Sequence, residues 1–234
     1  MPIPAIYMKT LSRLKINGKR LKIYIETGLA RGEGVSLALK YGFKEVNSLE
    51  FYPEYIQSAR EKFKENSQSG KINFIQGDSG DNLRNCISNY ADPYLLFLDA
   101  HGHNAGTCPL SKEISGLKGF DKNLLLLIDD VYFIEYAKEN PNRAPWANEI
   151  NGLANLKNMI TDSFQTKPVF IKLIYPFVPA AYSEGGKNYI LLAINPKIKY
   201  TKYIIYLLRL TSIIFQILNP IVRLAKDTIK KIIS

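Results

Sequence analysis

Acidic residues and both histidines of this 234-residue chain follow short apolar runs. His101 and His103 come directly after the run LLFLD, which ends in Asp99, and a second run, LLLLI, is followed by the pair Asp129–Asp130. Carboxylates gathered at one place bind a hard divalent cation through oxygen. A histidine beside them has a pKa suited to moving a proton near neutral pH. These residue types together indicate metal-assisted acid–base chemistry.

The elements that must position these residues alternate between strand and helix patterns. Such alternation predicts βαβ units and a parallel sheet with helices on both faces. Two later runs, KPVFIKLIYPF and KNYILLAIN, are predicted to close the sheet as an antiparallel pair, which makes a seven-stranded, mostly parallel α/β fold. The five predicted parallel strands are residues 21–28, 45–52, 71–79, 93–101 and 123–133.

In an open α/β sheet, ligands bind in the crevice outside the carboxyl ends of the strands. Acidic residues lie at or near these ends in all five predicted parallel strands, so we expect them to line one edge of the sheet. They are Glu26, Glu50, Asp78, Asp99 and the pair Asp129–Asp130.

The first strand-to-helix turn, YIETGLARGEGV, is rich in glycine. Glycine lets the backbone approach a ligand closely, and a helix N-terminus offers free N–H groups. The spacing of Gly28, Gly32 and Gly34 is Gly-x-x-x-Gly-x-Gly, which differs from the Gly-x-Gly-x-x-Gly of dinucleotide binders and disfavours an NAD-dependent oxidoreductase. Glu26 before the turn suits a cofactor with a cationic amino-acid end better than a pyrophosphate.

Two further acids extend this predicted cofactor site. Glu50, at the end of the second strand, is placed to accept hydrogen bonds from ribose hydroxyls, and Asp78, after the third, to accept one from an adenine amino group. A glycine-rich turn alone is often only structural. The acids at the next two strand ends favour the binding interpretation.

The motifs ETGLARGEG, SLE, GDS, FLDAH and LIDD resemble those of class I S-adenosylmethionine-dependent methyltransferases, and among these the metal-dependent sugar O-methyltransferases of the macrocin type. The likeness spans about residues 20–195. That branch carries Glu-x-Gly-x-x-Arg-Gly after its first strand, matched here by Glu26, Gly28, Arg31 and Gly32. It also carries an Asp ending the fourth strand and an Asp-Asp pair ending the fifth, matched by Asp99 and Asp129–Asp130.

The resemblance implies a Rossmann-like fold, S-adenosylmethionine as methyl donor, and Mg²⁺ or another hard divalent cation held by the three aspartates. It also implies a sugar hydroxyl of a glycan or glycoconjugate as acceptor. Related enzymes carry a base shortly after the fourth-strand Asp, which favours His101 as the base, with His103 orienting the substrate.

Three alternatives stay open at this stage. Asp129 or Asp130 can cap the following helix, which is a common role for Asp. The two histidines can be a solvated pair in a loop. On the level of the whole protein, the alternative to an enzyme is a non-catalytic module that binds a glycan or a partner and keeps the fold.

The net charge of +10 is concentrated in the tail. Residues 197–234 hold eight of the 31 Lys and Arg and one of the 21 Asp and Glu, so they carry +7 and residues 1–196 carry +3. A nearly neutral body disfavours binding to nucleic acid. The two cysteines, Cys86 and Cys108, form no disulfide framework, and the start lacks the pattern of a secretion signal, so we expect a cytoplasmic protein.

The tail differs in composition from the methyltransferase-like domain predicted for residues 1–196. Residues 203–218 are mostly apolar, Asn219-Pro220 is expected to break the helix, and residues 221–233 alternate aliphatic with basic side chains. The first piece is too short and too interrupted for a clear membrane span. We therefore expect two amphipathic helices that bind the cytoplasmic face of a membrane. The alternative is a helical arm that forms a homo-oligomer.

Overall fold

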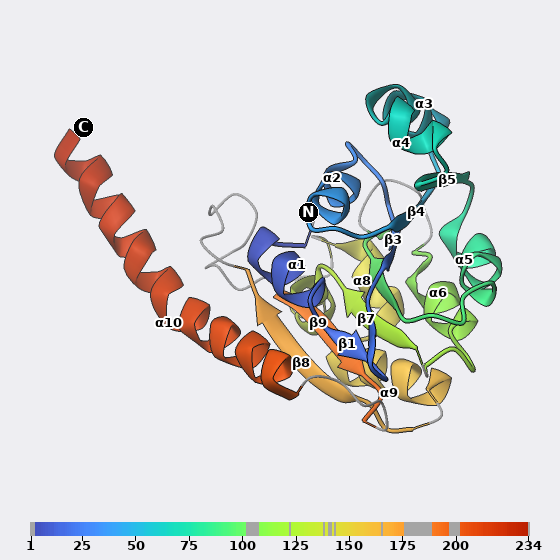
Figure 1. Cartoon of the computed structure of the whole chain (residues 1–234). Coiled ribbons are helices and arrows are strands. Elements are labelled where there is room, and N and C mark those ends of the chain that lie inside the picture. Colours follow the sequence, from blue (N-terminus) through green and yellow to red (C-terminus); the bar gives the residue numbers. More distant parts are fainter. Residues whose placement is uncertain are drawn as a thin grey trace.

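The computed structural model describes residues 3–101, 108–121, 123–137, 139, 142, 144–164, 166–175, 189–196 and 202–233. Its centre is a seven-stranded sheet in the order β5-β4-β3-β6-β7-β9-β8 (Figure 1). Strands β5, β4, β3, β6 and β7 are parallel, and β9 runs antiparallel to both β7 and β8. The predicted seven-stranded, mostly parallel sheet is confirmed. The strands are β3 (Ile23–Thr27), β4 (Glu45–Glu50), β5 (Ile72–Gln76), β6 (Tyr94–Leu98), β7 (Leu124–Ile128), β8 (Val169–Ile174) and β9 (Tyr189–Ile194).

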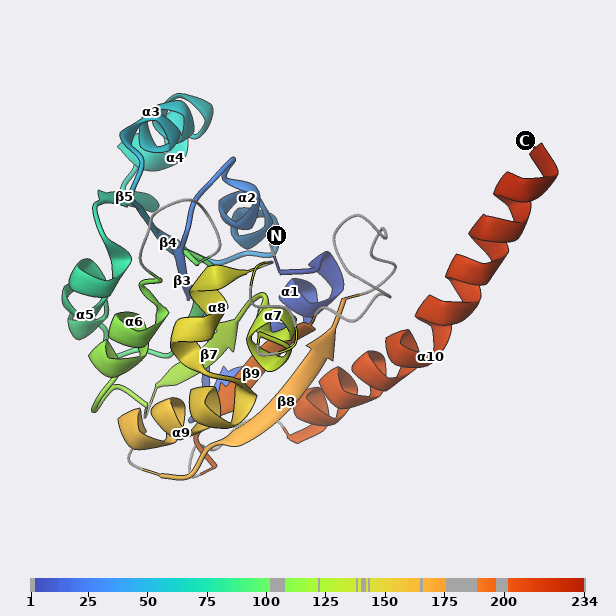
Figure 2. The ribbon, with the colours of Figure 1, turned by 180° about the vertical axis from the view of Figure 1, so that it is seen from behind.

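Helices cover both faces of this sheet (Figure 2). Every residue of β3, β6, β7 and β9 is buried, as expected for strands that pack against helices on two sides. One face packs against α1 (Ala5–Leu11), α2 (Glu33–Lys40), α3 (Pro53–Lys62) and the first part of α10 (Lys202–Ile233). The other packs against α5 (Ser79–Ser88), α6 (Leu110–Gly116), α7 (Val131–Glu135), α8 (Pro145–Ile150) and α9 (Leu153–Ser163), and the short α4 (Lys64–Gln68) follows α3.

The N-terminal elements were not predicted from the sequence. Helix α1 packs into the core, and a two-stranded hairpin of β1 (Lys15–Ile16) and β2 (Lys19–Arg20) joins it to β3. The predicted strand 123–133 is wrong in its second half, because β7 ends at Ile128 and α7 begins at Val131. Between them Asp130 has a left-handed backbone with φ +52° and lies at the helix N-cap. The residues after this turn are also apolar, so the hydrophobic pattern of the sequence does not show where the strand ends and the helix begins.

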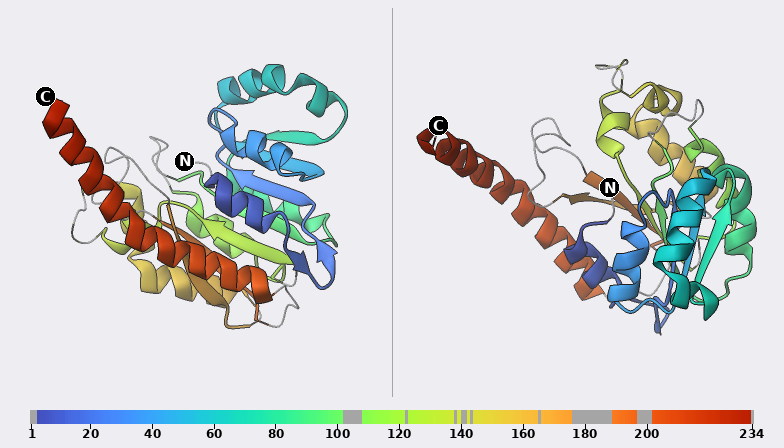
Figure 3. Two further views of the ribbon diagram at one scale, coloured as in Figure 1. Left: turned by 60° about the vertical axis from the view of Figure 1, so that its left-hand side comes forward. Right: turned by 90° about the horizontal axis from the view of Figure 1, so that it is seen from above.

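The predicted break at Asn219-Pro220 is also wrong. The tail is one helix of 32 residues, α10, with Pro220 inside it. A proline removes one hydrogen bond of the helix and costs about 3 kcal/mol. Asn219 is anchored to the edge of the sheet by a hydrogen bond from its side chain to the carbonyl of Tyr175 (2.7 Å). Packing of the preceding turns holds the helix up to this point, and the remainder extends away from the fold (Figures 1 and 3).

The first half of α10 belongs to the hydrophobic core. Ile205, Leu208 and Phe215 lie in the same buried cluster as Tyr7 and Leu11 of α1. The division of the chain at residue 196 stays a prediction, but this cluster crosses it.

Candidate functional site

The strand order reverses between β3 and β6, and in α/β sheets the ligand crevice is expected at this point. The chain leaves β3 at Thr27 and turns at Gly28, whose φ is +84°. A Cβ at Gly28 would lie 2.6 Å from the carbonyl oxygen of Asp99, which follows β6. The backbone N–H of Asp99 also donates to the hydroxyl and the carbonyl of Thr27 (both 3.2 Å). Glycine at position 28 therefore lets the first loop lie directly against the aspartate.

Glu26 lies beneath this loop and is buried. Its carboxylate accepts hydrogen bonds from the hydroxyls of Tyr24 (2.8 Å) and Ser48 (2.9 Å). A Cβ at Gly34 would lie 2.0 Å from one of the carboxylate oxygens, so glycine is required there. Burial, with a smaller contribution from the charge of Glu50, raises the pKa of Glu26 to about 7, and the hydrogen bonds from Tyr24 and Ser48 oppose this rise. This carboxylate supports the first turn of α2 and keeps its negative charge poorly solvated.

Gly32 and Arg31, the other two predicted site residues of the first loop, differ in their surroundings. Gly32 is the N-cap of α2 with φ +70°, and a Cβ there would meet the ring of Phe63 at 2.7 Å. Arg31 is exposed, and its carbonyl accepts a hydrogen bond from Lys62 (2.9 Å). The structure thus gives Gly32 a clear reason to be glycine, whereas the role of Arg31 in cofactor binding stays a prediction.

Glu50 and Asp78 fix the two neighbouring loops. The carboxylate of Glu50 accepts from the backbone N–H groups of Ala30 (3.1 Å) and Tyr52 (2.9 Å), which ties the first loop to the end of β4. Asp78 caps α5 by accepting from the N–H of Gly80 (2.7 Å). A carboxylate oxygen accepts more than one hydrogen bond. Both acids therefore keep a role in loop structure alongside the predicted contacts to a nucleoside.

Three aspartates follow the ends of β6 and β7. Asp129 is fully buried, and its carboxylate accepts from the N–H of Asp130 (2.8 Å) and from the hydroxyl of Tyr175. Burial raises the pKa of Asp129 to about 7, and the charge of Asp130 adds to this effect. Burial, followed by the charges of Asp129 and Asp130, raises the pKa of Asp99 well above its ordinary range. Asp129 and Asp130 therefore act electrostatically on Asp99, whereas the convergence of all three carboxylates on one cation stays a prediction.

The donor chemistry of these aspartates fits a hard divalent cation, since each would be relieved of repulsion by a positive charge. Within the described residues, however, no group of three or more Asp, Glu, His or Cys side chains is arranged to hold a metal ion. Mg²⁺ in proteins is commonly bound by one or two carboxylates with water and substrate oxygens completing its shell. The described geometry is compatible with that kind of site and does not form a three-carboxylate cage.

His101 is buried beside these aspartates. Its Nε2 lies 3.0 Å from the carbonyl oxygen of Asp129. A carbonyl only accepts, so Nε2 carries the proton and Nδ1 carries the lone pair. Nδ1 has no hydrogen-bond partner within the described part of the chain. Burial lowers the pKa of His101, which keeps the ring neutral. His103 lies outside the described residues.

Sequence reasoning missed two buried polar residues near the crevice. Glu113, in the first turn of α6, is fully buried and accepts from the hydroxyl of Ser79 (2.6 Å). Its other oxygen has no partner among the described residues. In the sequence it resembles an ordinary acid near a helix N-terminus. Tyr175 follows β8 and resembles one more aromatic residue of a strand, so neither carried a recognisable signal.

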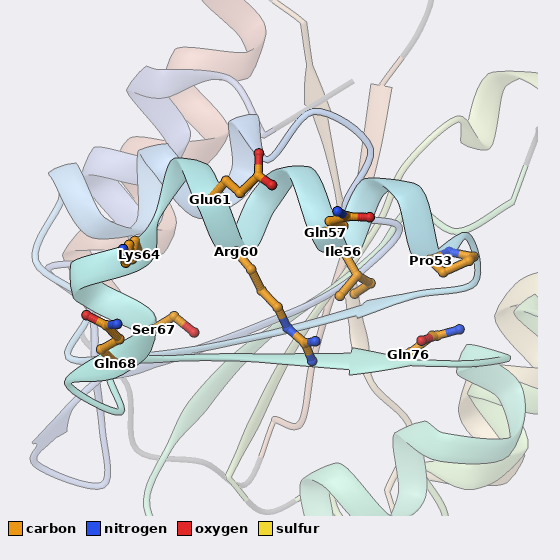
Figure 4. Close-up of a pocket in the computed structure, with 9 residues that line it drawn as sticks. All are labelled: Pro53, Ile56, Gln57, Arg60, Glu61, Lys64, Ser67, Gln68 and Gln76. Carbon is orange, nitrogen blue, oxygen red and sulfur yellow. The ribbon is translucent and has the colours of Figure 1, made fainter.

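A cavity of about 640 Å³ lies between α3, α4 and β5. Figure 4 shows Arg60 extending from α3 toward β5, with Gln76 at one end of the cavity and Gln68 at the other. None of the predicted site residues lines it. We assign no role to this cavity.

Comparison with known proteins identifies the fold. No family model and no curated protein matches the chain. The solved structure of an O-methyltransferase from Bacillus cereus in complex with SAH has a TM-score of 0.54 at 13% identity, over 83% of this chain and 82% of that one. The O-methyltransferase TomG from Streptomyces achromogenes, involved in tomaymycin synthesis and solved with SAM, has a TM-score of 0.50 at 12% identity, over 81% and 78%. The chain therefore has the fold of these methyltransferases.

Proposed function

We propose that this protein is an S-adenosylmethionine-dependent O-methyltransferase that acts on a sugar hydroxyl of a membrane-associated glycan or glycoconjugate. The observation that carries the proposal is the state of His101. Its Nε2 is engaged by the Asp129 carbonyl, so the nitrogen with the lone pair, Nδ1, is left without a partner in the described residues, beside the carboxylates. This is the arrangement of a general base waiting for a substrate proton.

The cofactor would lie in the crevice above β3 and β6. Glu26 supplies negative charge beneath the first loop, toward the cationic end of the cofactor. Glu50 at the end of β4 and Asp78 before α5 supply acceptors for the ribose and the adenine. Gly28 and Gly32 allow the loop to approach, and Arg31 flanks it. Magnesium, bound by Asp99 with Asp129 or Asp130, would lower the pKa of an acceptor hydroxyl.

Methyl transfer then needs one proton acceptor and alignment of the acceptor oxygen with the methyl group of the cofactor. The hydroxyl oxygen of the acceptor forms a bond to the methyl carbon as the bond from carbon to the sulfonium sulfur breaks, which leaves S-adenosylhomocysteine. The hydroxyl proton moves to Nδ1 of His101. Because the Asp129 carbonyl already accepts from Nε2, it stabilises the imidazolium that forms.

A groove of about 590 Å³ lies between α7, β8 and α10. Tyr132 and Tyr136 line it, with ring centroids 4.8 Å apart, and Tyr132 follows Asp130 by two residues. Aromatic faces suit sugar rings, which supports a saccharide as acceptor. The sequence offers two further aromatic residues for a sugar site, Trp146 and Tyr182. The ring of Trp146 contacts that of His101 at a tilt of 48°, whereas Tyr182 lies outside the described residues.

The membrane part of the proposal rests on α10. Its buried side chains form one stripe, and the opposite side exposes large apolar side chains, including Ile217 at 60% exposure. Residues 205–222 of α10 are long and apolar enough to cross a membrane by length and composition, with 22% of them buried. The buried stripe holds this segment against β8, which favours a helix lying on the cytoplasmic surface over one that spans. The exposed stripe is Tyr206, Leu210, Ile213, Ile214, Ile217, Leu218 and Ile221.

The methyltransferase proposal is tested by calorimetry with S-adenosylhomocysteine, followed by transfer of labelled methyl groups to a panel of glycans and lipid-linked saccharides. We expect the product to bind, transfer to depend on Mg²⁺, and His101→Gln to abolish transfer while leaving product binding intact. Tight binding of NAD instead would favour an oxidoreductase. Product binding without transfer to any saccharide would favour the non-catalytic module.

A further inference from the structure

The outer edge of β8 is completed by side chains of α10. Ser212 accepts a hydrogen bond from the N–H of Ile174 (3.0 Å) and donates one to the carbonyl of Lys172 (2.7 Å). Ser212 thus takes the place of a neighbouring strand for the exposed edge. Two turns later Asn219 donates to the carbonyl of Tyr175 (2.7 Å). The helix therefore fixes the backbone of the strand at its carboxyl end, on the side where the aspartates lie.

Tyr175 connects this end of the strand to the site. Its side chain is 1% exposed, and its hydroxyl donates to the carboxylate of Asp129. The Asp129 carbonyl in turn accepts from Nε2 of His101, whose ring contacts that of Trp146 at a tilt of 48° with the centroids 4.6 Å apart. An unbroken series of contacts therefore runs from α10 to the proposed base.

Packing alone does not account for these residue types. A Phe at position 175 would fill almost the same volume, and an aliphatic residue at position 219 would suit a buried helix face. Burying a hydroxyl and an amide costs free energy unless each finds a partner of correct geometry. Here both groups find one: Asn219 on the Tyr175 backbone, and Tyr175 on the Asp129 carboxylate.

We propose that α10 is part of the active site: Asn219 positions Tyr175, and Tyr175 positions the carboxylate of Asp129. Both are positioning residues, because each acts through another group: Asn219 through the backbone of Tyr175, and Tyr175 through the carboxylate of Asp129. The inference rests on the proposed function in one respect, the role of Asp129 in the active site. One consequence follows for the tail: the helix that exposes Ile217 and Ile221 to a membrane also supports the acceptor side of the crevice through its opposite face.

The test compares four full-length variants with the wild type: Tyr175→Phe, Asn219→Ala, the double variant, and Thr211→Ala as a control. Thr211 lies on the same helix about two turns before Asn219 and does not line the groove between α7, β8 and α10. Trp146 is the single tryptophan of the chain, so its emission and its quenching by acrylamide report on the region next to His101. Thermal unfolding is recorded for each variant to separate positioning from stability.

We expect both single variants to change Trp146 quenching in the same direction, the double variant to match Tyr175→Phe, and Thr211→Ala to match the wild type. Once an acceptor substrate is identified, kcat of the Tyr175→Phe and Asn219→Ala variants should be about 10- to 100-fold lower than that of the wild type, as is typical for groups that orient a catalytic carboxylate. The KM for S-adenosylmethionine should be unchanged. Non-additivity in the double variant is the signature of residues that act in series.

Two outcomes would overturn the inference. One is a lower melting temperature in both variants with Trp146 quenching and kcat unchanged, which would make the contacts purely structural. The other is strictly additive effects on kcat, which would make the two residues independent. Failure of the wild type to bind S-adenosylhomocysteine would refute the proposed function instead, and the fluorescence comparison would still decide whether the contacts act in series.

Discussion

Glu113 is expected to destabilise the fold once it ionises. It is fully buried, one of its carboxylate oxygens has no partner among the described residues, and burial raises its pKa from 4.5 to about 7. The folded protein therefore keeps this proton to a higher pH than the unfolded chain does. A raised carboxyl pKa lowers stability as pH rises from about 4.5 to about 7, and the loss stays constant above that range.

The magnitude follows from the size of the shift. One pKa unit corresponds to about 1.36 kcal/mol, so a rise from 4.5 to about 7 costs the folded state about 3 kcal/mol above pH 7. Glu113→Gln keeps the shape and removes the ionisation. The variant should therefore be about 3 kcal/mol more stable than the wild type near pH 8. Near pH 4.5 the two proteins should differ by only about 0.4 kcal/mol, because Glu113 is then protonated in the folded protein and half ionised in the unfolded chain.

Urea denaturation followed by circular dichroism, at both pH values and without cofactor, measures this difference. Glu33→Gln is the matched control, since Glu33 is exposed in the first turn of α2 and should show no comparable dependence on pH. If Glu113→Gln changed the free energy of unfolding by the same amount at the two pH values, Glu113 would not titrate in this range. If the variant were less stable than the wild type at both pH values, the hydrogen bond of Glu113 with Ser79 would contribute more than the charge costs.

Further predictions concern the loop, the cofactor and the tail. Gly28→Ala should cost more than about 2 kcal/mol in urea denaturation, because a Cβ there meets the Asp99 carbonyl, whereas Gly18→Ala, at φ +81° with nothing within 4 Å, should cost only about 1 kcal/mol. In calorimetry, the affinity for S-adenosylmethionine should fall as pH drops below about 7, because the cationic cofactor binds best when Glu26 is ionised; Glu26→Gln should abolish this dependence, and an unchanged pH profile would contradict it. Ile217→Glu should weaken sedimentation with anionic vesicles without lowering the melting temperature, whereas Gln216→Glu, with the same added charge, should have a smaller effect; equal losses would show that charge rather than apolar contact governs binding.

The sheet was predictable because each strand is a short apolar run bounded by a turn. Residues such as the five of β7 are buried on both faces, so their pattern leaves little choice other than a central strand. Gly28 was predictable because it lies in a glycine-rich turn after a strand, where its φ of +84° favours glycine. These are local constraints, and the sequence displays them directly.

The contacts that complete the site are not local. Tyr175 lies 46 residues from Asp129, and Asn219 lies 44 residues from Tyr175. Nothing in the spacing of these residues distinguishes them from other polar positions. The same limitation explains the error at Pro220: sequence rules for helix ends do not include the packing of Ile205, Leu208 and Phe215, which holds α10 to the sheet.

The two faces of α10 explain why its sequence resembled a detachable tail. Buried residues recur at 205, 208, 212, 215 and 219, the spacing of a helix that packs on a protein, and include the polar Ser212 and Asn219. Between them lie Tyr206, Ile213 and Ile217, which face away and are more than half exposed. A helix that is apolar on both sides needs a second partner for its outer face. The inner face shows that removing residues 197–234 would also remove part of the core. Point substitutions on the outer face are therefore the way to separate membrane binding from support of Asp129.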